Sequence, residues 1–269
     1  MKRTICTYNE KAKLNYKLRN LITPCLGGLE LFLKNVKDNI SDSFPTIIDY
    51  LKNFYEKVEN YDVSIDSDYE ILVQYSKILN GSKNHVLSLV NYTKYNPESI
   101  DDEIEIDTKD LVRTFTQFEY IFMKSLLEIM NREETIEYIK KLSEEVSLSR
   151  RDPNNYVDSF IESTDRFKNN LARWQMQECV TGPLDEERLL YKVKKCEWAD
   201  ALRDFDSDLC YAMLCYSDFE GAKNLNPSFI LTRKKTLMMG DDYCDFCYHD
   251  TRTDKDLSHP SKNEFEDLG

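Results

Sequence analysis

The chain has 269 residues, with 36 basic and 49 acidic side chains, and its formal net charge is −13 at pH 7. An acidic excess of this size argues against sequence-independent binding to nucleic acid or to an anionic membrane, because both depend on clustered Lys and Arg. Hydrophobic residues make up 41% and charged residues 32% of the chain, which is typical of a globular protein with a sizeable core.

Glycine-dependent nucleotide sites are not expected. The chain contains 7 glycines, well below the average usage of roughly 7%. Neither G-x-G-x-x-G nor G-x-x-x-x-G-K-[ST] occurs, and both phosphate cradles need glycine so that the backbone can approach the phosphate. Rossmann and P-loop chemistry are therefore disfavoured, and we expect no cofactor.

The N-terminus and the cysteines indicate the compartment. The segment from Met1 to Lys11 lacks the apolar stretch of a signal peptide. No run of about 18 uncharged apolar residues predicts a transmembrane helix. The 8 cysteines, without an export signal, are typical of reduced thiols. We therefore expect a cytoplasmic protein with no nucleic-acid or membrane partner.

Residues 1–205 are predicted to be almost wholly helical. Ser43-Phe44-Pro45 opens a helix, since a hydroxyl and a first-turn proline favour a helix start. Ser67 and Glu70 form a capping box for the next helix, and Gly81 is expected to end it. The apolar residues that recur at helical spacing in these two segments are Ile47, Ile48, Leu51, Phe54, Tyr55, Val58, Ile71, Leu72, Tyr75, Ile78 and Leu79.

The helical pattern continues through four further segments. Apolar positions between Lys109 and Met130 cover more than one stripe, which predicts a helix buried on several sides. Asn131 and Glu134 restart a helix, and Glu186–Trp198 is predicted to be another short one. A helix beginning at Asp152-Pro153 carries one apolar face, made of Phe160, Phe167, Leu171 and Trp174.

After Asp206 the pattern becomes strand-like. Apolar or alternating stretches occupy Leu209–Tyr216, Ser228–Arg233, Thr236–Met239 and, after a turn at Gly240, Tyr243–His249. We expect three strands in an antiparallel sheet packed on the preceding helices. The fold class is therefore α+β, with one domain over residues 1–250 (1–205 helical, 206–250 strands) and a loose polar tail over 251–269.

A zinc site made of cysteines is not expected. Cys210, Cys215, Cys244 and Cys247 offer four sulfurs, and the last two form a C-x-x-C pair. In a strand, however, residues three apart point to opposite faces, and zinc knuckles need a tight turn between paired ligands. We expect no metal, and the alternative for these thiols is packing as small hydrophobes.

The segment 243–249 also contains candidates for nucleophilic catalysis. Side chains of a strand alternate between two faces, which places Cys244, Phe246 and Tyr248 on one face and Asp245, Cys247 and His249 on the other. A nucleophilic cysteine needs a nearby histidine or cation to lower its pKa, and the local candidates are His249 and Arg233. Alternate strand positions lie roughly 7 Å apart, long for a direct Cys–His pair. A structural role for His249 therefore stays open beside a catalytic one.

The segment from Leu209 to Tyr248 resembles the family of L-2-amino-thiazoline-4-carboxylic acid hydrolases. The family pattern is C-x-x-D, followed by an Arg before T-L-x-x-G-x-x-x-C-D-F. The matching positions in this chain are Cys215, Asp218, Arg233, Thr236, Gly240, Cys244, Asp245 and Phe246.

The resemblance implies a reaction and roles for these residues. The family substrate is a cyclic isothiourea bearing a carboxylate, whose hydrolysis, expected at a carbon–nitrogen bond, gives N-carbamoyl-cysteine. Cys244 is expected to be the nucleophile or the wall beside an activated water, with Asp245 and Asp218 orienting the amidinium or moving protons. Arg233 is expected to hold the substrate carboxylate. The remaining candidates are His249 as a catalytic group and Cys215 and Thr236 as pocket-lining residues.

A fainter resemblance connects the same segment to the small-molecule-sensing 4-vinyl-reductase domain. There a cysteine shares a zinc with the later cysteine, whereas this chain has Thr236 at the position eight before Cys244. Two alternatives to a hydrolase therefore stay open: a non-catalytic small-molecule-binding protein and an accessory protein of a biosynthetic pathway. A small-molecule substrate is the expected partner, and apolar helix faces allow a homodimer.

Overall fold

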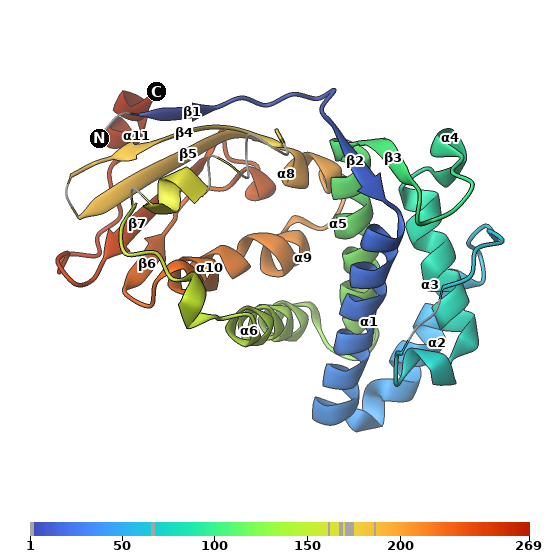
Figure 1. Ribbon diagram of the computed structural model, residues 1–269. Helices are drawn as coiled ribbons and strands as arrows, with labels where there is room; N and C mark the ends of the chain where they lie inside the picture. The colour runs from blue at the N-terminus through green and yellow to red at the C-terminus, as the bar shows by residue number, and fades with distance from the viewer. Residues whose placement is uncertain (1–2, 66–67, 161, 167–168, 170–174, 186) are drawn as a thin grey trace. The chain divides into compact units, whose positions relative to one another are not determined.

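The computed structural model describes residues 3–65, 68–160, 162–166, 169, 175–185 and 187–269 (Figure 1). The chain divides into two compact units. We call residues Lys13–Thr135 the helical unit, and Met1–Ala12 together with Ile136–Gly269 the sheet unit. The expectation of one domain over 1–250 stays a prediction, since two compact units can belong to one domain.

The helical unit is built from long helices and one short two-stranded sheet. Its elements are β2 (Lys13–Lys17), α1 (Arg19–Asn39), η1 (Ser41–Ser43), α2 (Phe44–Tyr55), η2 (Leu72–Gln74), α3 (Ser76–Leu89), α4 (Tyr92–Tyr95), β3 (Glu103–Asp107), α5 (Thr108–Lys124) and η3 (Ser125–Glu128). β2 and β3 pair antiparallel. Helices α1, α3 and α5 pack against one another, and the rings of Phe32 and Phe122 lie 5.0 Å apart in their core.

Three helix predictions in this unit are confirmed. Pro45 lies in the first turn of α2. α5 is buried on more than one side, as its buried residues Leu111, Val112, Phe118, Tyr120, Phe122 and Met123 show. At the start of α6 (Arg132–Ser149) the backbone N–H of Asn131 donates to Glu134 Oε2 over 3.2 Å, and that of Glu134 donates to Asn131 Oδ1 over 3.0 Å. This reciprocal capping is the arrangement that the sequence predicts.

The predicted role of Gly81 as a helix end was wrong. Gly81 lies inside α3, which begins at Ser76, and Ser67 lies outside the described residues. A Cβ at position 81 would stand 2.4 Å from the Cβ of Tyr55 on α2. The glycine therefore permits close packing of α2 and α3, a tertiary requirement that local capping signals do not contain.

The sheet unit contains a five-stranded antiparallel sheet in the order β1-β4-β5-β7-β6. Its strands are β1 (Thr4–Cys6), β4 (Gln177–Pro183), β5 (Arg188–Cys196), β6 (Phe229–Thr232) and β7 (Cys244–Asp250). The other elements are η4 (Pro153–Asn155), α8 (Glu197–Ala201), α9 (Ser207–Cys210), a π turn η5 (Tyr211–Cys215), α10 (Ser217–Leu225), η6 (Leu237–Met239) and α11 (Lys262–Leu268).

The α+β class is confirmed, but the sheet draws on more of the chain than predicted. β1, β4 and β5 come from the part that was expected to be helical. Glu186–Trp198 was predicted to be a helix, yet Arg188–Cys196 forms the central strand β5. Its apolar residues are buried on both faces of the sheet, so the strict alternation that marks a half-exposed strand is missing.

Two segments predicted to be strands are helical turns instead. Leu209–Tyr216 lies in α9 and η5, and Asp206 caps α9 by accepting from the backbone N–H groups of Asp208 and Leu209. A continuous apolar run does not by itself distinguish a buried helix from a buried strand. Thr236–Met239 is a capped 3₁₀ turn. The predictions for β6 and β7 are confirmed.

The expectation of a loose tail after residue 250 was also wrong. α11 begins with a capping box of Ser261 and Glu264, and it packs against β4 and β5. Phe265 and Leu268 are buried in one apolar cluster with Cys247. Of the predicted apolar face over 160–174, Phe160 is buried, whereas Phe167, Leu171 and Trp174 lie outside the described residues.

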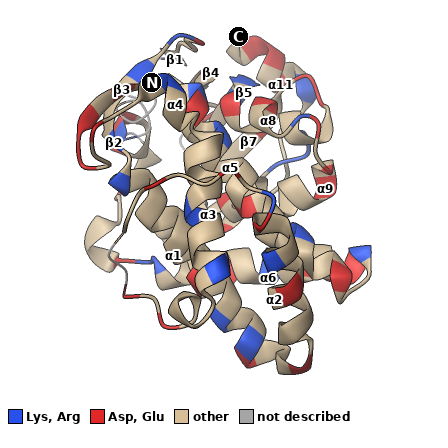
Figure 2. Cartoon of the chain, turned by 90° about the vertical axis from the view of Figure 1, so that its right-hand side faces the viewer, with Lys and Arg blue, Asp and Glu red and all other residues tan. Residues whose placement is uncertain are grey.

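Charge is distributed along the helices and loops. Figure 2 shows Lys and Arg positions interspersed with Asp and Glu positions on many elements. Several of them form exposed ion pairs, for example Lys77 with Glu56 at 2.7 Å. In the described part of the chain, no helix is both long and apolar enough to cross a bilayer.

Candidate active site on strand β7 and its preceding loop

The loop between β6 and β7 positions most of the predicted site residues. Thr236 Oγ1 accepts from the backbone N–H of Met238 over 3.3 Å, and Asp241 Oδ2 accepts from that of Thr236 over 2.8 Å. Gly240 ends the turn with φ +89°, a left-handed conformation that glycine adopts without a steric penalty. The turn places Thr236 beside the first residue of β7.

Arg233, at the start of this loop, is enclosed by aromatic rings. Its Cζ lies 5.2 Å from the ring centroid of Tyr211, 5.1 Å from that of Phe219 and 5.0 Å from that of Phe246. The Arg233 side chain is only 2% exposed. A guanidinium held over aromatic faces gains cation–π attraction, which grows when water is excluded.

The same guanidinium carries a fixed carboxylate partner. Nη1 of Arg233 donates to Asp218 Oδ2 over 2.6 Å, and Nη2 donates to the carbonyl oxygen of Cys215 over 2.8 Å. The Asp218 side chain is 40% exposed, and its Oδ1 makes no hydrogen bond with the described residues. Arg233 therefore fixes one oxygen of Asp218 and leaves the other available.

Burial and pairing shift the pKa values of both groups. Burial acts to lower the pKa of the Arg233 guanidinium, but the neighbouring Asp218 raises it above its ordinary value. Desolvation raises the pKa of the Asp218 carboxyl, and Arg233 opposes that rise. The result is a permanently charged guanidinium beside a carboxylate that is more basic than an exposed one.

Two thiols flank the Thr236 hydroxyl. Cys244 Sγ lies 3.6 Å from Thr236 Oγ1 and accepts from the backbone N–H of Leu237 over 3.2 Å. Thr236 Oγ1 also lies 3.9 Å from Cys215 Sγ. Burial raises the pKa of both thiols, so in this structure they are neutral at pH 7. We call Cys215, Asp218, Arg233, Thr236 and Cys244 the Arg233 cluster.

Asp245 and His249 lie on the opposite face of β7. Cys244, Phe246 and Tyr248 pack in one core cluster and Cys247 in another, which confirms the predicted alternation. Asp245 Oδ1 accepts from the backbone N–H groups of Lys234 and Lys235 over 2.8 and 2.7 Å. Asp245 and His249 are therefore not brought to Cys244.

Asp245 and His249 both contact polar groups from other segments of the chain. Although burial acts to raise it, the pKa of Asp245 is lowered by His259 and by the two backbone N–H groups. His249 Nδ1 lies 2.6 Å from Asp254 Oδ2 and its Nε2 lies 2.9 Å from Thr232 Oγ1. His259 and Asp254, from the segment that was expected to be a loose tail, therefore contact Asp245 and His249. The polar composition of that segment did not predict these contacts.

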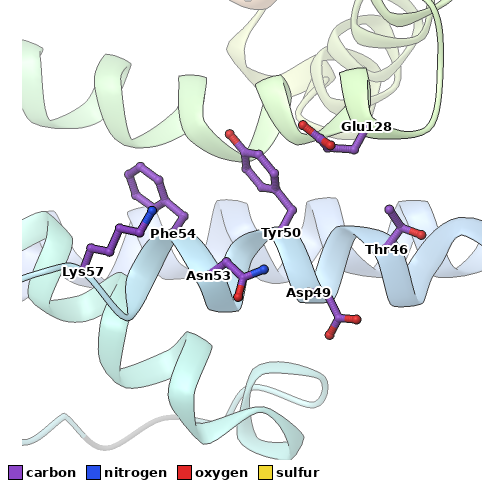
Figure 3. Close-up of a pocket in the computed structure, with 7 residues that line it drawn as sticks. All are labelled: Thr46, Asp49, Tyr50, Asn53, Phe54, Lys57 and Glu128. Atoms are coloured by element: carbon purple, nitrogen blue, oxygen red, sulfur yellow. The ribbon is translucent and has the colours of Figure 1, made fainter.

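The helical unit contains a pocket, and none of the residues that line it is a predicted site residue. It is lined by Thr46, Asp49, Tyr50, Asn53, Phe54, Lys57 and Glu128 (Figure 3). Tyr50 and Phe54 point toward the segment that carries Glu128. Among the described residues, no group of three or more His, Cys, Asp or Glu side chains is arranged to hold a metal ion.

Comparison with known proteins bears on the Arg233 cluster. The family model for L-2-amino-thiazoline-4-carboxylic acid hydrolase matches residues 113–248, which is half of the chain. The match contains every member of the cluster together with Asp245, and it ends before His249. No curated protein and no solved structure matches the chain. The chain belongs to the L-2-amino-thiazoline-4-carboxylic acid hydrolase family.

Proposed function

We propose that the protein is a hydrolase that opens a small cyclic isothiourea or amidine, such as L-2-amino-thiazoline-4-carboxylate, by adding water at the amidine carbon. The observation that carries the proposal is the half-exposed Asp218 carboxylate, held by buried Arg233 beside Thr236 and two thiols. All of these residues lie in the segment that matches the family.

Asp218 is the proposed general base. Its Oδ2 is bonded to Arg233 and its Oδ1 is available, and a raised pKa makes a carboxylate a better proton acceptor. In this proposal Asp218 takes a proton from the attacking water while the new carbon–oxygen bond forms. The proton on Asp218 then passes to the leaving atom of the ring, and the second hydrogen of the water passes to the nitrogen that stays bonded to the carbon as the carbonyl forms. Asp218 therefore ends the cycle ionised.

The product determines which ring bond breaks. N-carbamoyl-cysteine keeps the ring nitrogen bonded to the former amidine carbon, so its formation breaks the carbon–sulfur bond and frees a thiol. Cleavage of the ring carbon–nitrogen bond, as expected above, would instead give S-carbamoyl-cysteine and a free amine. The carbon–nitrogen expectation is therefore inconsistent with the expected product, and we propose carbon–sulfur cleavage.

The contacts support altered roles for two residues. Arg233 is buried and already bonded to Asp218 and to the Cys215 carbonyl, which supports a positioning role better than the expected binding of the substrate carboxylate. Cys244 has a raised pKa, which supports a pocket wall better than an activated nucleophile. A cytoplasmic location and a homodimer stay predictions.

The test is hydrolysis of L-2-amino-thiazoline-4-carboxylate followed by mass spectrometry, with a thiol reagent to distinguish the two products. We expect the mass of one added water and a free thiol with the natural chain. Asp218→Asn should reduce the rate by about 100-fold or more, the usual contribution of a general base. Asp242→Asn is the matched control, because Asp242 is exposed on the neighbouring loop.

The raised pKa values of both cluster thiols also favour a second candidate, a protein that binds such a molecule without converting it. Saturable binding of the substrate with unchanged mass would support this candidate and would contradict the hydrolase. Equal turnover by the natural chain and Asp218→Asn would keep the hydrolase and remove Asp218 as the base.

A further inference from the structure

Five side chains on the other face of β7 form one continuous chain of contacts, in which Asp245, His249 and Asp254 are buried. Asp254 Oδ2 lies 2.6 Å from His249 Nδ1, and His249 Nε2 lies 2.9 Å from Thr232 Oγ1. The same hydroxyl lies 2.9 Å from His259 Nδ1, and His259 Nε2 lies 3.1 Å from Asp245 Oδ2. We call Asp254, His249, Thr232, His259 and Asp245 the two-histidine chain.

The hydrogens in this chain can be counted. Three of its four contacts are hydrogen bonds, and the fourth, between His259 Nε2 and Asp245 Oδ2, is a close approach that is an ion pair only if the histidine is protonated. Each contact joins two electronegative atoms, which repel each other unless a hydrogen lies between them. A neutral imidazole supplies one N–H, a hydroxyl supplies one O–H and a carboxylate supplies none. Two neutral histidines and Thr232 therefore supply three hydrogens for four contacts. One contact has two facing acceptors unless a further proton is bound.

We propose that the two-histidine chain binds one excess proton, so that one of His249 and His259 is an imidazolium between two carboxylates. The orientation of the Thr232 hydroxyl decides which of the two histidines carries the charge. When Thr232 donates to His249, the charge is on His259, and when it donates to His259, the charge is on His249. The chain is therefore a single proton-binding site formed by both histidines.

Burial favours binding of the excess proton over a contact that lacks a hydrogen. His249 is 0% exposed, and His259 Nε2 is buried without an aligned hydrogen bond among the described residues. A carboxylate that faces an imidazole lone pair in such a place is costly, because a buried charge needs a partner. The backbone N–H groups of Lys234 and Lys235, which donate to Asp245 Oδ1, favour the ionised carboxylate and so favour placing the proton on a histidine.

The charged groups near the chain are mainly acidic, although one cation, Arg188, interacts electrostatically with Asp254. Cys247, between Asp245 and His249 on the same face of β7, interacts electrostatically with Arg188, Asp185, Asp254 and Glu264. Arg188 on β5 is paired with Asp185 at 2.6 Å. Glu264 at the start of α11 adds a further negative charge near the chain. The local balance is acidic and so favours one bound proton.

Asp245 connects the two-histidine chain to the loop between β6 and β7. Asp245 faces His259 with Oδ2 and holds the backbone N–H groups of Lys234 and Lys235 with Oδ1. These two residues lie between Arg233 and Thr236, both members of the Arg233 cluster. His259 and Asp245 are therefore positioning residues for the cluster, a step that rests on the proposed function, whereas the proton count does not.

Nitrogen NMR on the full chain tests the proton count directly. The chain has 3 histidines, and burial lowers the pKa of the third, His85, to about 4, so it is neutral near pH 8. With ¹⁵N-labelled histidine, ring nitrogen shifts distinguish an imidazolium from each neutral tautomer. At about pH 8, an exposed histidine is uncharged. We expect the shifts of His249 and His259 to show one imidazolium in total, either as one charged ring or as two rings with averaged shifts. Two neutral rings would overturn the proposal.

Two asparagine variants make the test specific, because an amide supplies the missing hydrogen. In Asp245→Asn the amide N–H₂ donates to His259 Nε2, and both histidines should become neutral with hydrogen on Nδ1. In Asp254→Asn the amide donates to His249 Nδ1, and both should become neutral with hydrogen on Nε2. Asp242→Asn, on the exposed loop, should leave the imidazolium in place.

The outcomes separate this proposal from the proposed hydrolase. Retention of the imidazolium in both asparagine variants would contradict the count, whatever the enzymatic result. Absence of hydrolysis with an imidazolium present would contradict the hydrolase alone. If either variant fails to fold, the spectrum of the natural chain still decides the proton count. Amide exchange at Lys234 and Lys235 reports separately whether Asp245→Asn loosens the loop.

Discussion

The guanidinium of Arg233 and the carboxylate of Asp218 form an asymmetric pair, with 2.6 Å between Nη1 and Oδ2 and side-chain exposures of 2% and 40%. The cation is fixed inside an aromatic cage, while the anion faces outward. Such a pair orients a carboxylate more firmly than a pair in which both partners are exposed, because neither water nor rotamer changes compete for the guanidinium. The candidate chemistry depends on this difference.

Arg233→Lys should destabilise the protein by about 2 kcal/mol, because an ammonium reproduces neither the two donor contacts nor the stacking on three rings. Chemical denaturation of the natural chain and the variant measures the change. Arg203→Lys serves as the control, since the Arg203 side chain is 74% exposed and its ion pair is with the neighbouring Asp200. Equal losses in the two variants would contradict the importance of the cage.

Cys244 should react slowly with iodoacetamide near pH 7, because burial raises its pKa and keeps it as a thiol. Peptide-resolved mass spectrometry after timed labelling measures the rate at each cysteine, and the same chain in denaturant gives the unprotected reference. The rate should rise as the pH is increased. Fast labelling of Cys244 in the folded protein at neutral pH would instead indicate an activated nucleophile.

The lowered pKa of Asp245 links its contacts to acid stability. A carboxyl with a lower pKa in the folded than in the unfolded chain stabilises the fold above its unfolded value, about 3.9. That stabilisation is lost as the pH falls through the folded value. The unfolding free energy of the natural chain, measured by chemical denaturation, should therefore fall as the pH is lowered below about 3.9. An unfolding free energy that stays constant between about pH 4 and about pH 3 would contradict this.

Gly81→Ala should destabilise the protein by about 1–3 kcal/mol, because the new methyl group would overlap with Tyr55 and force α2 and α3 apart. Gly28→Ala is the matched control on α1, where a Cβ meets nothing within 4 Å. Alanine there should stabilise the helix by about 0.5–1 kcal/mol. Thermal or chemical denaturation of the two variants gives opposite signs if Gly81 is a packing residue.

Much of the architecture was predictable where local signals and tertiary packing agree. The proline start of α2, the Asn131–Glu134 cap and the strand β7 all have signatures within a few residues. The errors lie where burial on all sides removes the periodic pattern. For that reason Leu209–Tyr216 was predicted to be a strand but is helical, and Arg188–Cys196 was predicted to be helical but is a strand.

The candidate site was predictable as far as the family motif reaches. Cys215, Asp218, Arg233, Thr236 and Cys244 do come together. The alternation along β7 already implied that Asp245 and His249 face away from Cys244, although the motif groups the residues by sequence. The rings of Tyr211 and Phe219 and the side chains of Asp254 and His259 were missed, because contacts distant in sequence have no local signature.

The most direct test of the proposed function is the rate of thiol release from L-2-amino-thiazoline-4-carboxylate by the natural chain, compared with Asp218→Asn and Asp242→Asn. We predict a product heavier by one water that carries a free thiol, a loss of about 100-fold or more in Asp218→Asn, and little change in Asp242→Asn. Substrate that binds but keeps its mass with the natural chain would contradict the hydrolase.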